Sequence, residues 1–189
     1  LPGTRAVDLR TDPAGKWLKP GFARAYEYSD CWVQDARLVV LNARDAEARG
    51  AKILTRAKVT DARRDGDAWE VTVATRGREK RFRARVLVNA GGPWVERLVR
   101  ETTHLAPRAH IRLVRGSHIV TRRLFDHDRA YFYQGTDGRI IFAIPYEEDF
   151  TLIGTTDVDH EGDPGRAECT EAEQDYLCAF ASQYFARPV

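Results

Sequence analysis

Three neighbouring stretches of the chain alternate apolar and polar residues, and this period of two is typical of strands with one buried face. The stretches are 53–62, 69–73 and 82–86. The sequence Asp-Gly-Asp at 65–67 separates the first two and is typical of a tight turn. The pattern therefore predicts a small antiparallel meander that buries one face.

A second set of alternating stretches follows residue 107 and predicts a four-stranded antiparallel sheet. Its predicted strands are 111–121, 130–134, 139–145 and 150–155. The first thirty residues instead contain three prolines and three glycines. They are therefore predicted to be largely irregular, until a strand over 22–33.

Helical spacing of apolar residues predicts one helix before the first of these sheets in the sequence and another after the second. One helix is predicted to begin at Asp35, as the capping residue, and to end at Gly50. The last helix is predicted to begin at a capping box formed by Thr170 and Glu173 and to end before Pro188.

The fully apolar run 86–88 is typical of a strand buried on both faces. The sequence Asn-Ala-Gly-Gly-Pro-Trp at 89–94 follows it, with Pro93 predicted as the first residue of a further helix. Strand, glycine turn and helix predict the edge of a doubly wound α/β unit, so the predicted fold class is mixed α+β and α/β. Amide groups at a helix start can bind an anion such as a pyrophosphate, although such a turn can also be purely structural.

Composition limits what this chain can be. With 189 residues it is long enough for one ordinary domain or for pieces of two. A net charge of +2 is not that of a polybasic arm, and no run of 18 apolar residues or signal peptide is present. Three cysteines without a C-x-x-C spacing indicate a reducing, cytosolic compartment. The absence of methionine suggests a segment excised from a longer chain.

His118 is the histidine with the clearest catalytic potential. The five histidines have no zinc-binding spacing, so no metal site is predicted. On a strand, His118 would share a face with Gly116 and Val120. An imidazole has an ordinary pKa of about 6.5 and can act as a general base, or it can be a hydrogen-bonded sheet histidine.

Two further groups of residues allow both a functional and a structural interpretation. The hydroxyls and carboxylate of 155–157 close the last predicted strand and could hold a polyol or a phosphate, or form a turn. The run 76–85 contains six cations and could bind nucleic acid or anionic lipid. Its alternation with Phe82 and Ala84 favours the solvated face of a hairpin.

Several segments together resemble the aerobic, FAD-dependent glycerol-3-phosphate dehydrogenases, over roughly residues 17–187. The matching segments are 28–39, 88–94, 112–120, 144–145, 153–157 and 162–164. The resemblance implies part of a GR2-type FAD-binding domain and an antiparallel-sheet substrate or cap domain. It assigns 1–33 to a cap-domain strand and lead-in, 34–106 to the partial FAD-binding domain and 107–189 to the substrate domain.

In that family the enzyme oxidises sn-glycerol 3-phosphate to dihydroxyacetone phosphate by hydride transfer to FAD. Electrons then pass to a quinone. The resemblance therefore implies a cytoplasmic protein, peripheral at the inner face of the membrane, with no nucleic-acid partner and with a homodimer as a further expectation. Two alternatives are a related FAD-dependent amine or amino-acid oxidase and a non-enzymatic basic module that binds lipid or nucleic acid.

The resemblance also implies roles for individual residues. His118 corresponds to a base that takes the proton of the C2 hydroxyl, and Thr155 to a threonine that lines the substrate pocket. Thr156 and Arg115 are expected to bind substrate beside it. The residues expected to contact FAD are Val59, Asn89, Ala90, Gly91, Gly92 and Trp94. Gly91 stands where many family members have Thr or Ala.

We expect the 189-residue chain by itself to be inactive and to bind FAD weakly or not at all. The G-x-G-x-x-G fingerprint that holds the FAD pyrophosphate in this family does not occur in the sequence. The absorbance spectrum of the purified chain, mixed with FAD and then desalted, tests this expectation. Retention of one flavin per chain would contradict it.

Overall fold

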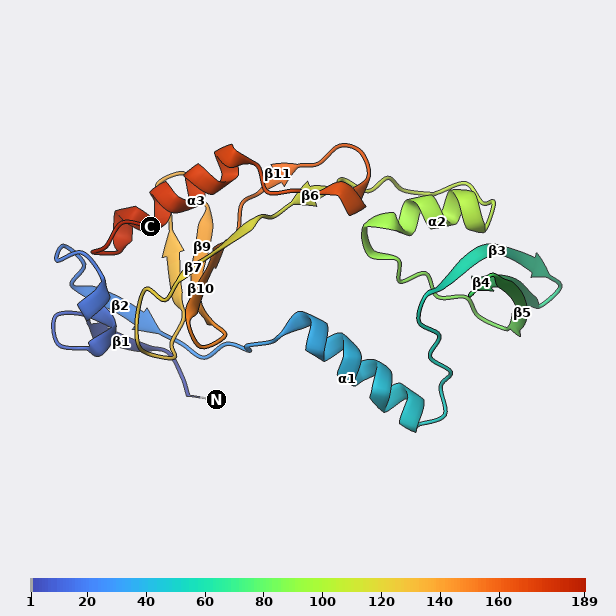
Figure 1. Ribbon diagram of the computed structural model, residues 1–189, viewed down its shortest axis with the longest axis horizontal. Coiled ribbons are helices and arrows are strands. Elements are labelled where there is room, and N and C mark those ends of the chain that lie inside the picture. Colours follow the sequence, from blue (N-terminus) through green and yellow to red (C-terminus); the bar gives the residue numbers. More distant parts are fainter. Residues whose placement is uncertain (1) are drawn as a thin grey trace. The chain divides into compact units, whose positions relative to one another are not determined.

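A computed structural model describes residues 2–189, which divide into two compact units. The first unit combines the residues up to Asp30 with Arg112–Val189, and the second is Cys31–Ile111. Figure 1 shows the elements in chain order. The predicted assignment of 1–33, 34–106 and 107–189 to parts of a flavoenzyme stays a prediction.

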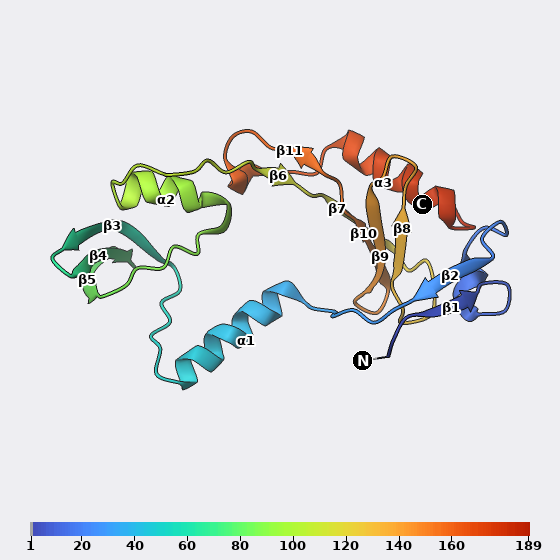
Figure 2. The same cartoon turned by 180° about the vertical axis from the view of Figure 1, so that it is seen from behind.

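The first unit contains the predicted four-stranded antiparallel sheet. Its strands are β7 (His118–Arg122), β8 (Tyr131–Gln134), β9 (Ile140–Tyr146) and β10 (Phe150–Gly154), in the order β7-β10-β9-β8. Figure 2 shows them from the side opposite to that of Figure 1. The strand predicted over 111–121 is divided: its first part is β6 (Val114–Arg115), which pairs with β11 (Val158–Asp159) instead.

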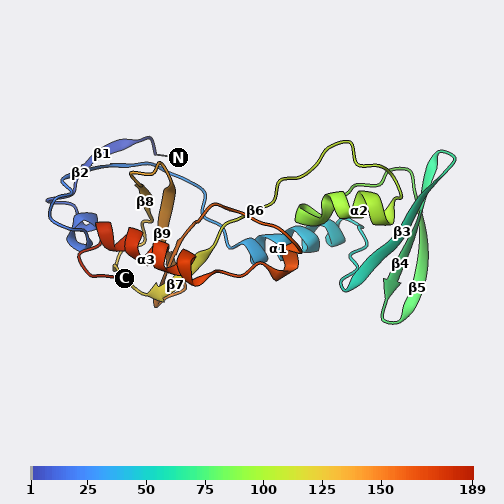
Figure 3. The same ribbon diagram turned by 90° about the horizontal axis from the view of Figure 1, so that it is seen from above.

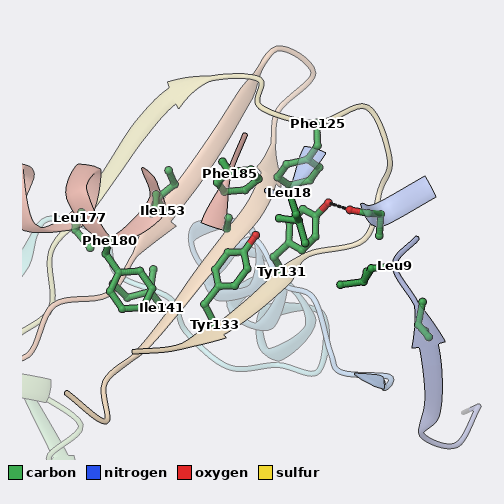
Figure 4. Packing of buried hydrophobic residues seen from close by; sticks show 14 residues of the cluster. Leu9, Leu18, Phe125, Tyr131, Tyr133, Ile141, Ile153, Leu177, Phe180 and Phe185 are labelled. Atoms are coloured by element: carbon green, nitrogen blue, oxygen red, sulfur yellow. Dashed lines mark hydrogen bonds between the residues drawn. The ribbon is translucent and has the colours of Figure 1, made fainter. Parts of the chain in front are cut away.

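Helix α3 (Glu171–Tyr184) covers one face of this sheet and begins with the predicted capping box. The Thr170 hydroxyl accepts from the backbone N–H of Glu173, and the Glu173 carboxylate accepts from that of Thr170. Leu177 and Phe180 belong to the same buried cluster as Ile141 and Ile153 of the sheet. Figure 4 shows these side chains together. The short helix η3 (Pro164–Arg166) precedes α3.

An N-terminal hairpin of β1 (Arg5–Asp8) and β2 (Arg24–Glu27) also belongs to the first unit, with the 3-10 helix η1 (Pro13–Trp17) between its strands. The prediction of a largely irregular start missed β1, and the strand expected over 22–33 is confined to β2. The hairpin is held by long-range contacts that its own sequence does not reveal: Arg129 forms ion pairs with Asp12 and Glu27.

The second unit contains the predicted meander of β3 (Ala57–Asp65), β4 (Ala68–Thr75) and β5 (Arg78–Ala84), paired in the order β3-β4-β5. Figure 3 shows the three strands side by side. One face buries Ala62, Val71 and Val73, as the alternation predicted. The predicted first helix is α1 (Asp35–Ala48), although Gln34 rather than Asp35 occupies the capping position.

The prediction of a buried strand over 86–88 is wrong for the described residues. These residues form no strand, and Val86 and Val88 are 71% and 80% exposed. A strand needs neighbours for its backbone hydrogen bonds, and every strand pair described in residues 2–189 is antiparallel and lies elsewhere. The helix predicted after the glycine turn is present as η2 (Gly92–Trp94) followed by α2 (Val95–Thr102).

Helices and antiparallel sheets therefore occur together, which confirms the predicted mixed fold class. Within residues 2–189, no helix combines the length and the apolar character needed to span a bilayer.

Replacing Leu177 by Ala should lower the free energy of unfolding of the first unit by roughly 2–5 kcal/mol, because the removed atoms leave a cavity in a close-packed core. Leu177 is fully buried. Urea unfolding followed by far-UV circular dichroism measures the change. Gln174→Ala on the exposed side of α3 is the matched control and should change stability by less than about 0.5 kcal/mol. Equal effects of the two variants would contradict the described packing.

Candidate functional site

His118 lies on the face of the four-stranded sheet opposite α3. It pairs across the strands with Gly154 of β10, which in turn pairs with Phe142 of β9. A side chain built on Gly154 would have its Cβ 2.2 Å from His118 Cδ2 and 2.6 Å from Cγ. The imidazole therefore occupies the space over the glycine, which only a residue without a side chain leaves open.

The surface around His118 is apolar and open. Phe142 continues the row to Phe132 of β8, with the two rings in edge-to-face contact and their centroids 5.1 Å apart. Phe132, Val120 and Phe150 are large hydrophobic residues that remain exposed. His118 thus places a polar imidazole beside exposed apolar side chains, and ligand sites likewise combine a mostly apolar lining with a few polar groups.

Thr155 follows directly after Gly154 and contacts Gly116 on the neighbouring segment. A Cβ on Gly116 would lie 2.4 Å from the Thr155 Oγ1 atom and 3.3 Å from the carbonyl oxygen of Thr156. The Gly154–Thr155 peptide bond is cis. The space at Gly154 is thus filled by His118 and the space at Gly116 by Thr155, and the common site of these two residues stays a prediction.

Thr156 and Arg115, also predicted to bind substrate, form contacts with Glu173 of α3. The Thr156 hydroxyl donates to Glu173 Oε1 at 2.9 Å. Arg115 donates from Nη2 to Oε2 at 2.8 Å and from Nε to Oε1 at 3.3 Å. The hydroxyl of Ser117 donates to Oε1 at 2.8 Å. Thr156 is 2% exposed, so it belongs to the interior of the first unit.

Glu173 is buried and ionised. Burial alone would raise the pKa of its carboxyl group, but the backbone N–H of Thr170, the guanidinium of Arg115 and the hydroxyls of Thr170 and Ser117 outweigh this effect. They hold the pKa of Glu173 well below its ordinary value. Sequence reasoning identified Glu173 only as part of a capping box, and its partners at 115–117 are 56 to 58 residues away.

In the second unit, Asn89 organises the glycine turn. Its side-chain amide donates to the carbonyl oxygen of Val95 at 2.9 Å, and its Oδ1 accepts from the N–H of Gly91 at 3.2 Å. Gly92 has a positive φ of 53°, which favours glycine. Ala90, Gly92 and Trp94 are exposed, so the turn is accessible.

Val59 and the cationic run 76–85, which were also singled out from the sequence, lie in the meander of the second unit. Val59 is partly buried against the cluster of Ala62 and Val71. On the opposite side of the sheet, Arg81 and Arg83 pair with acidic residues of their own meander, Glu70 and Asp65. These pairs favour the interpretation of 76–85 as a solvated face. Within residues 2–189, no cluster of histidine, cysteine and acidic residues is suited to a metal ion.

Comparison with known proteins identifies the family. The family model described as "FAD dependent oxidoreductase" (DAO) matches residues 4–189, so the chain belongs to this family of flavin-dependent oxidoreductases. The predicted flavoprotein class is thereby confirmed.

Relatives within the family agree with the resemblance noted from the sequence segments. The chain is 43% identical to the aerobic glycerol-3-phosphate dehydrogenase of Escherichia coli over 99% of its length, and 44% identical to the D-erythritol 1-phosphate dehydrogenase of Brucella abortus over 98%. It spans only 37% of each relative.

A solved structure, that of the glycerol-3-phosphate dehydrogenase from Bacillus halodurans complexed with FAD, has a TM-score of 0.72 and 27% identity. It covers 97% of this chain, which in turn covers 40% of that structure. The predicted similarity to this group of enzymes is confirmed.

Replacing Gly154 by Ala should displace the His118 ring, because the new methyl group would overlap its atoms. We expect a loss of roughly 1–3 kcal/mol in the free energy of unfolding, together with shifted imidazole resonances of His118 in NMR spectra. Gly21→Ala is the control, because no atom lies within 4 Å of its added Cβ. Unchanged His118 resonances in Gly154→Ala would contradict the described contact.

Proposed function

We propose that this chain is part of an FAD-dependent enzyme that oxidises sn-glycerol 3-phosphate to dihydroxyacetone phosphate. The observation that carries the proposal is the placement of His118 over Gly154, the residue directly before Thr155, on an open sheet face. The names of relatives such as the E. coli enzyme support the same substrate. Because the chain covers 37% of that relative, the activity is proposed for a full-length protein that contains the chain.

The first unit supplies the proton acceptor in this proposal. His118 takes the proton of the substrate's C2 hydroxyl through a ring nitrogen, which raises electron density on that oxygen and favours departure of the C2 hydride. The hydroxyl of Thr155 holds a polar atom of the substrate. Arg115 and Thr156 remain proposed substrate residues, although the contacts described above direct their polar groups to Glu173.

When bound, FAD would supply the hydride acceptor for C2 of the substrate. The accessible turn of the second unit suits an extended dinucleotide, because Gly92 has no side chain and no atom lies within 4 Å of the space a Cβ would occupy. The residues that we propose to contact the cofactor are Val59, Asn89, Ala90, Gly91, Gly92 and Trp94. The side chain of Asn89 contributes by fixing the turn.

We further propose that a quinone receives the electrons and that the full-length enzyme is peripheral at the inner face of the cytoplasmic membrane. A homodimer is a further expectation. These three proposals rest on the family resemblance. A quinone analogue that reoxidises the reduced enzyme in the presence of vesicles would support the first two.

A second candidate substrate is D-erythritol 1-phosphate. The observation that favours it is the 44% identity to the Brucella abortus dehydrogenase over 98% of this chain, a similarity close to that of the E. coli enzyme. Both compounds are phosphorylated polyols with a secondary hydroxyl. Steady-state assays of the full-length enzyme with both substrates, at equal concentration and with an artificial electron acceptor, decide between them through kcat/KM.

Replacing His118 by Gln in the full-length enzyme should lower kcat with glycerol 3-phosphate by about 10²–10⁴-fold, which is the usual contribution of general acid–base catalysis. Flavin content, measured by absorbance, should change little, because the proposed FAD contacts are made by other residues. Steady-state kinetics at several pH values measures the loss.

His160→Gln is the matched control for His118→Gln. His160 also lies in the first unit, and its side chain contacts the carbonyl oxygen of Asp163 rather than the open sheet face. It should keep the kcat of the unmodified enzyme. Unchanged turnover in His118→Gln would remove His118 from the catalytic role.

A further inference from the structure

Glu173 is the one charged side chain that is buried among residues 2–189. Three of the five buried polar or charged residues described belong to one cluster, namely Glu173, Ser117 and Thr156. Burying a carboxylate is costly, and apolar residues of similar volume often stabilise a protein as well or better. A buried charge of this kind therefore needs a reason other than stability.

We infer that Glu173 is a positioning residue for His118 and Thr155. This inference rests on the proposed function, because it assigns Glu173 a part in the reaction that those two residues carry out. Glu173 touches neither of them. It acts through Ser117 and Thr156, the residues next to them in the chain.

The chain alternates between two sides at this point. Ser117 directs its hydroxyl to Glu173 on the α3 side, whereas His118 follows on the open face. Thr156 likewise directs its hydroxyl to Glu173, immediately after Thr155. Because neighbouring residues are joined by a planar peptide bond, holding the backbone of one member of each pair restricts where the other can lie.

The two segments are also bonded to each other through the same atoms. The N–H of Ser117 donates to the Thr156 hydroxyl at 2.8 Å, and the N–H of Thr156 donates to the Ser117 carbonyl at 3.2 Å. The Thr156 hydroxyl thus accepts from one segment while it donates to Glu173. This relay orients both segments against α3.

Helix capping alone does not account for these contacts. A capping box requires only the reciprocal bonds between Thr170 and Glu173. The Glu173 carboxylate accepts additional bonds from Arg115, Ser117 and Thr156. A glutamine offers a single acceptor oxygen, so it cannot satisfy all of these donors.

The test uses the full-length, flavin-loaded enzyme with Glu173→Gln. We expect kcat to fall by about tenfold to a hundredfold, the loss typical of a small misplacement of catalytic groups, with unchanged flavin absorbance. Glu171→Gln is the matched control, because it makes the same change at an exposed position in the first turn of α3. It should retain the kcat and KM of the unmodified enzyme.

Ser117→Ala provides a second, milder variant. It removes one donor to Glu173 and should lower kcat in the same direction by a smaller factor, so the test remains valid if Glu173→Gln fails to fold. Both variants are assayed well below their melting temperatures. A lower melting temperature with unchanged kcat and KM would show that the cluster is purely structural and would overturn the inference.

Hydrogen exchange provides a readout that does not depend on turnover. In Glu173→Gln, peptides covering 113–120 and 152–158 should exchange faster, while peptides from β8 and β9 should not. Unchanged exchange would contradict the inference even if the enzyme is active. If the unmodified enzyme does not oxidise either polyol phosphate, the proposed function is wrong, and exchange alone then decides whether Glu173 fixes the two segments.

Discussion

The hydrogen bonds to the buried carboxylate of Glu173 are the constraint shared by the segments around the candidate site. It lies in the interior, where an isolated charge is strongly disfavoured, and hydrogen bonds from Arg115, Ser117, Thr156 and Thr170 compensate for the lost water. One ionised group thereby connects the start of α3 to two separate segments of the sheet region. Because every partner donates, the arrangement requires the ionised form, in agreement with the lowered pKa.

The open face of the sheet, which carries His118, is the reverse side of the face that packs against α3. Side chains alternate along β7 and β10, so Ile119 and Ile153 pack into the cluster on the α3 side while His118 and Gly154 lie on the open face. Gly154 then gives the His118 ring room to lie over the strand, and Gly116 allows Thr155 to come close. The requirement at these two glycines is for space, whereas Gly92 in the second unit is required for its positive φ.

Local patterns in the sequence predicted the elements whose sequence signal is local. The meander, the four-stranded sheet and the capping box at Thr170 were all confirmed, because alternation and capping chemistry act over a few residues. The strand predicted over 86–88 failed because pairing depends on a neighbour that no local pattern reveals. The hairpin strand Arg5–Asp8 was missed for a related reason: it pairs with β2, and Arg129, more than a hundred residues away, forms ion pairs with Glu27 of β2 and with Asp12 between the two strands.

In the candidate site, too, some residues could be identified from the local sequence and others only from contacts between distant segments. His118 and Thr155 could be singled out as candidates because their segments resemble a family and their chemistry is evident from residue type, and their roles stay a proposal. Glu173 could not, because a glutamate three residues after a threonine already has a sufficient local explanation as a cap. Only the fold shows that the Glu173 carboxylate also accepts hydrogen bonds from the hydroxyls of Ser117 and Thr156. A residue with a simple local role can thus acquire a second one when the chain brings distant donors to it.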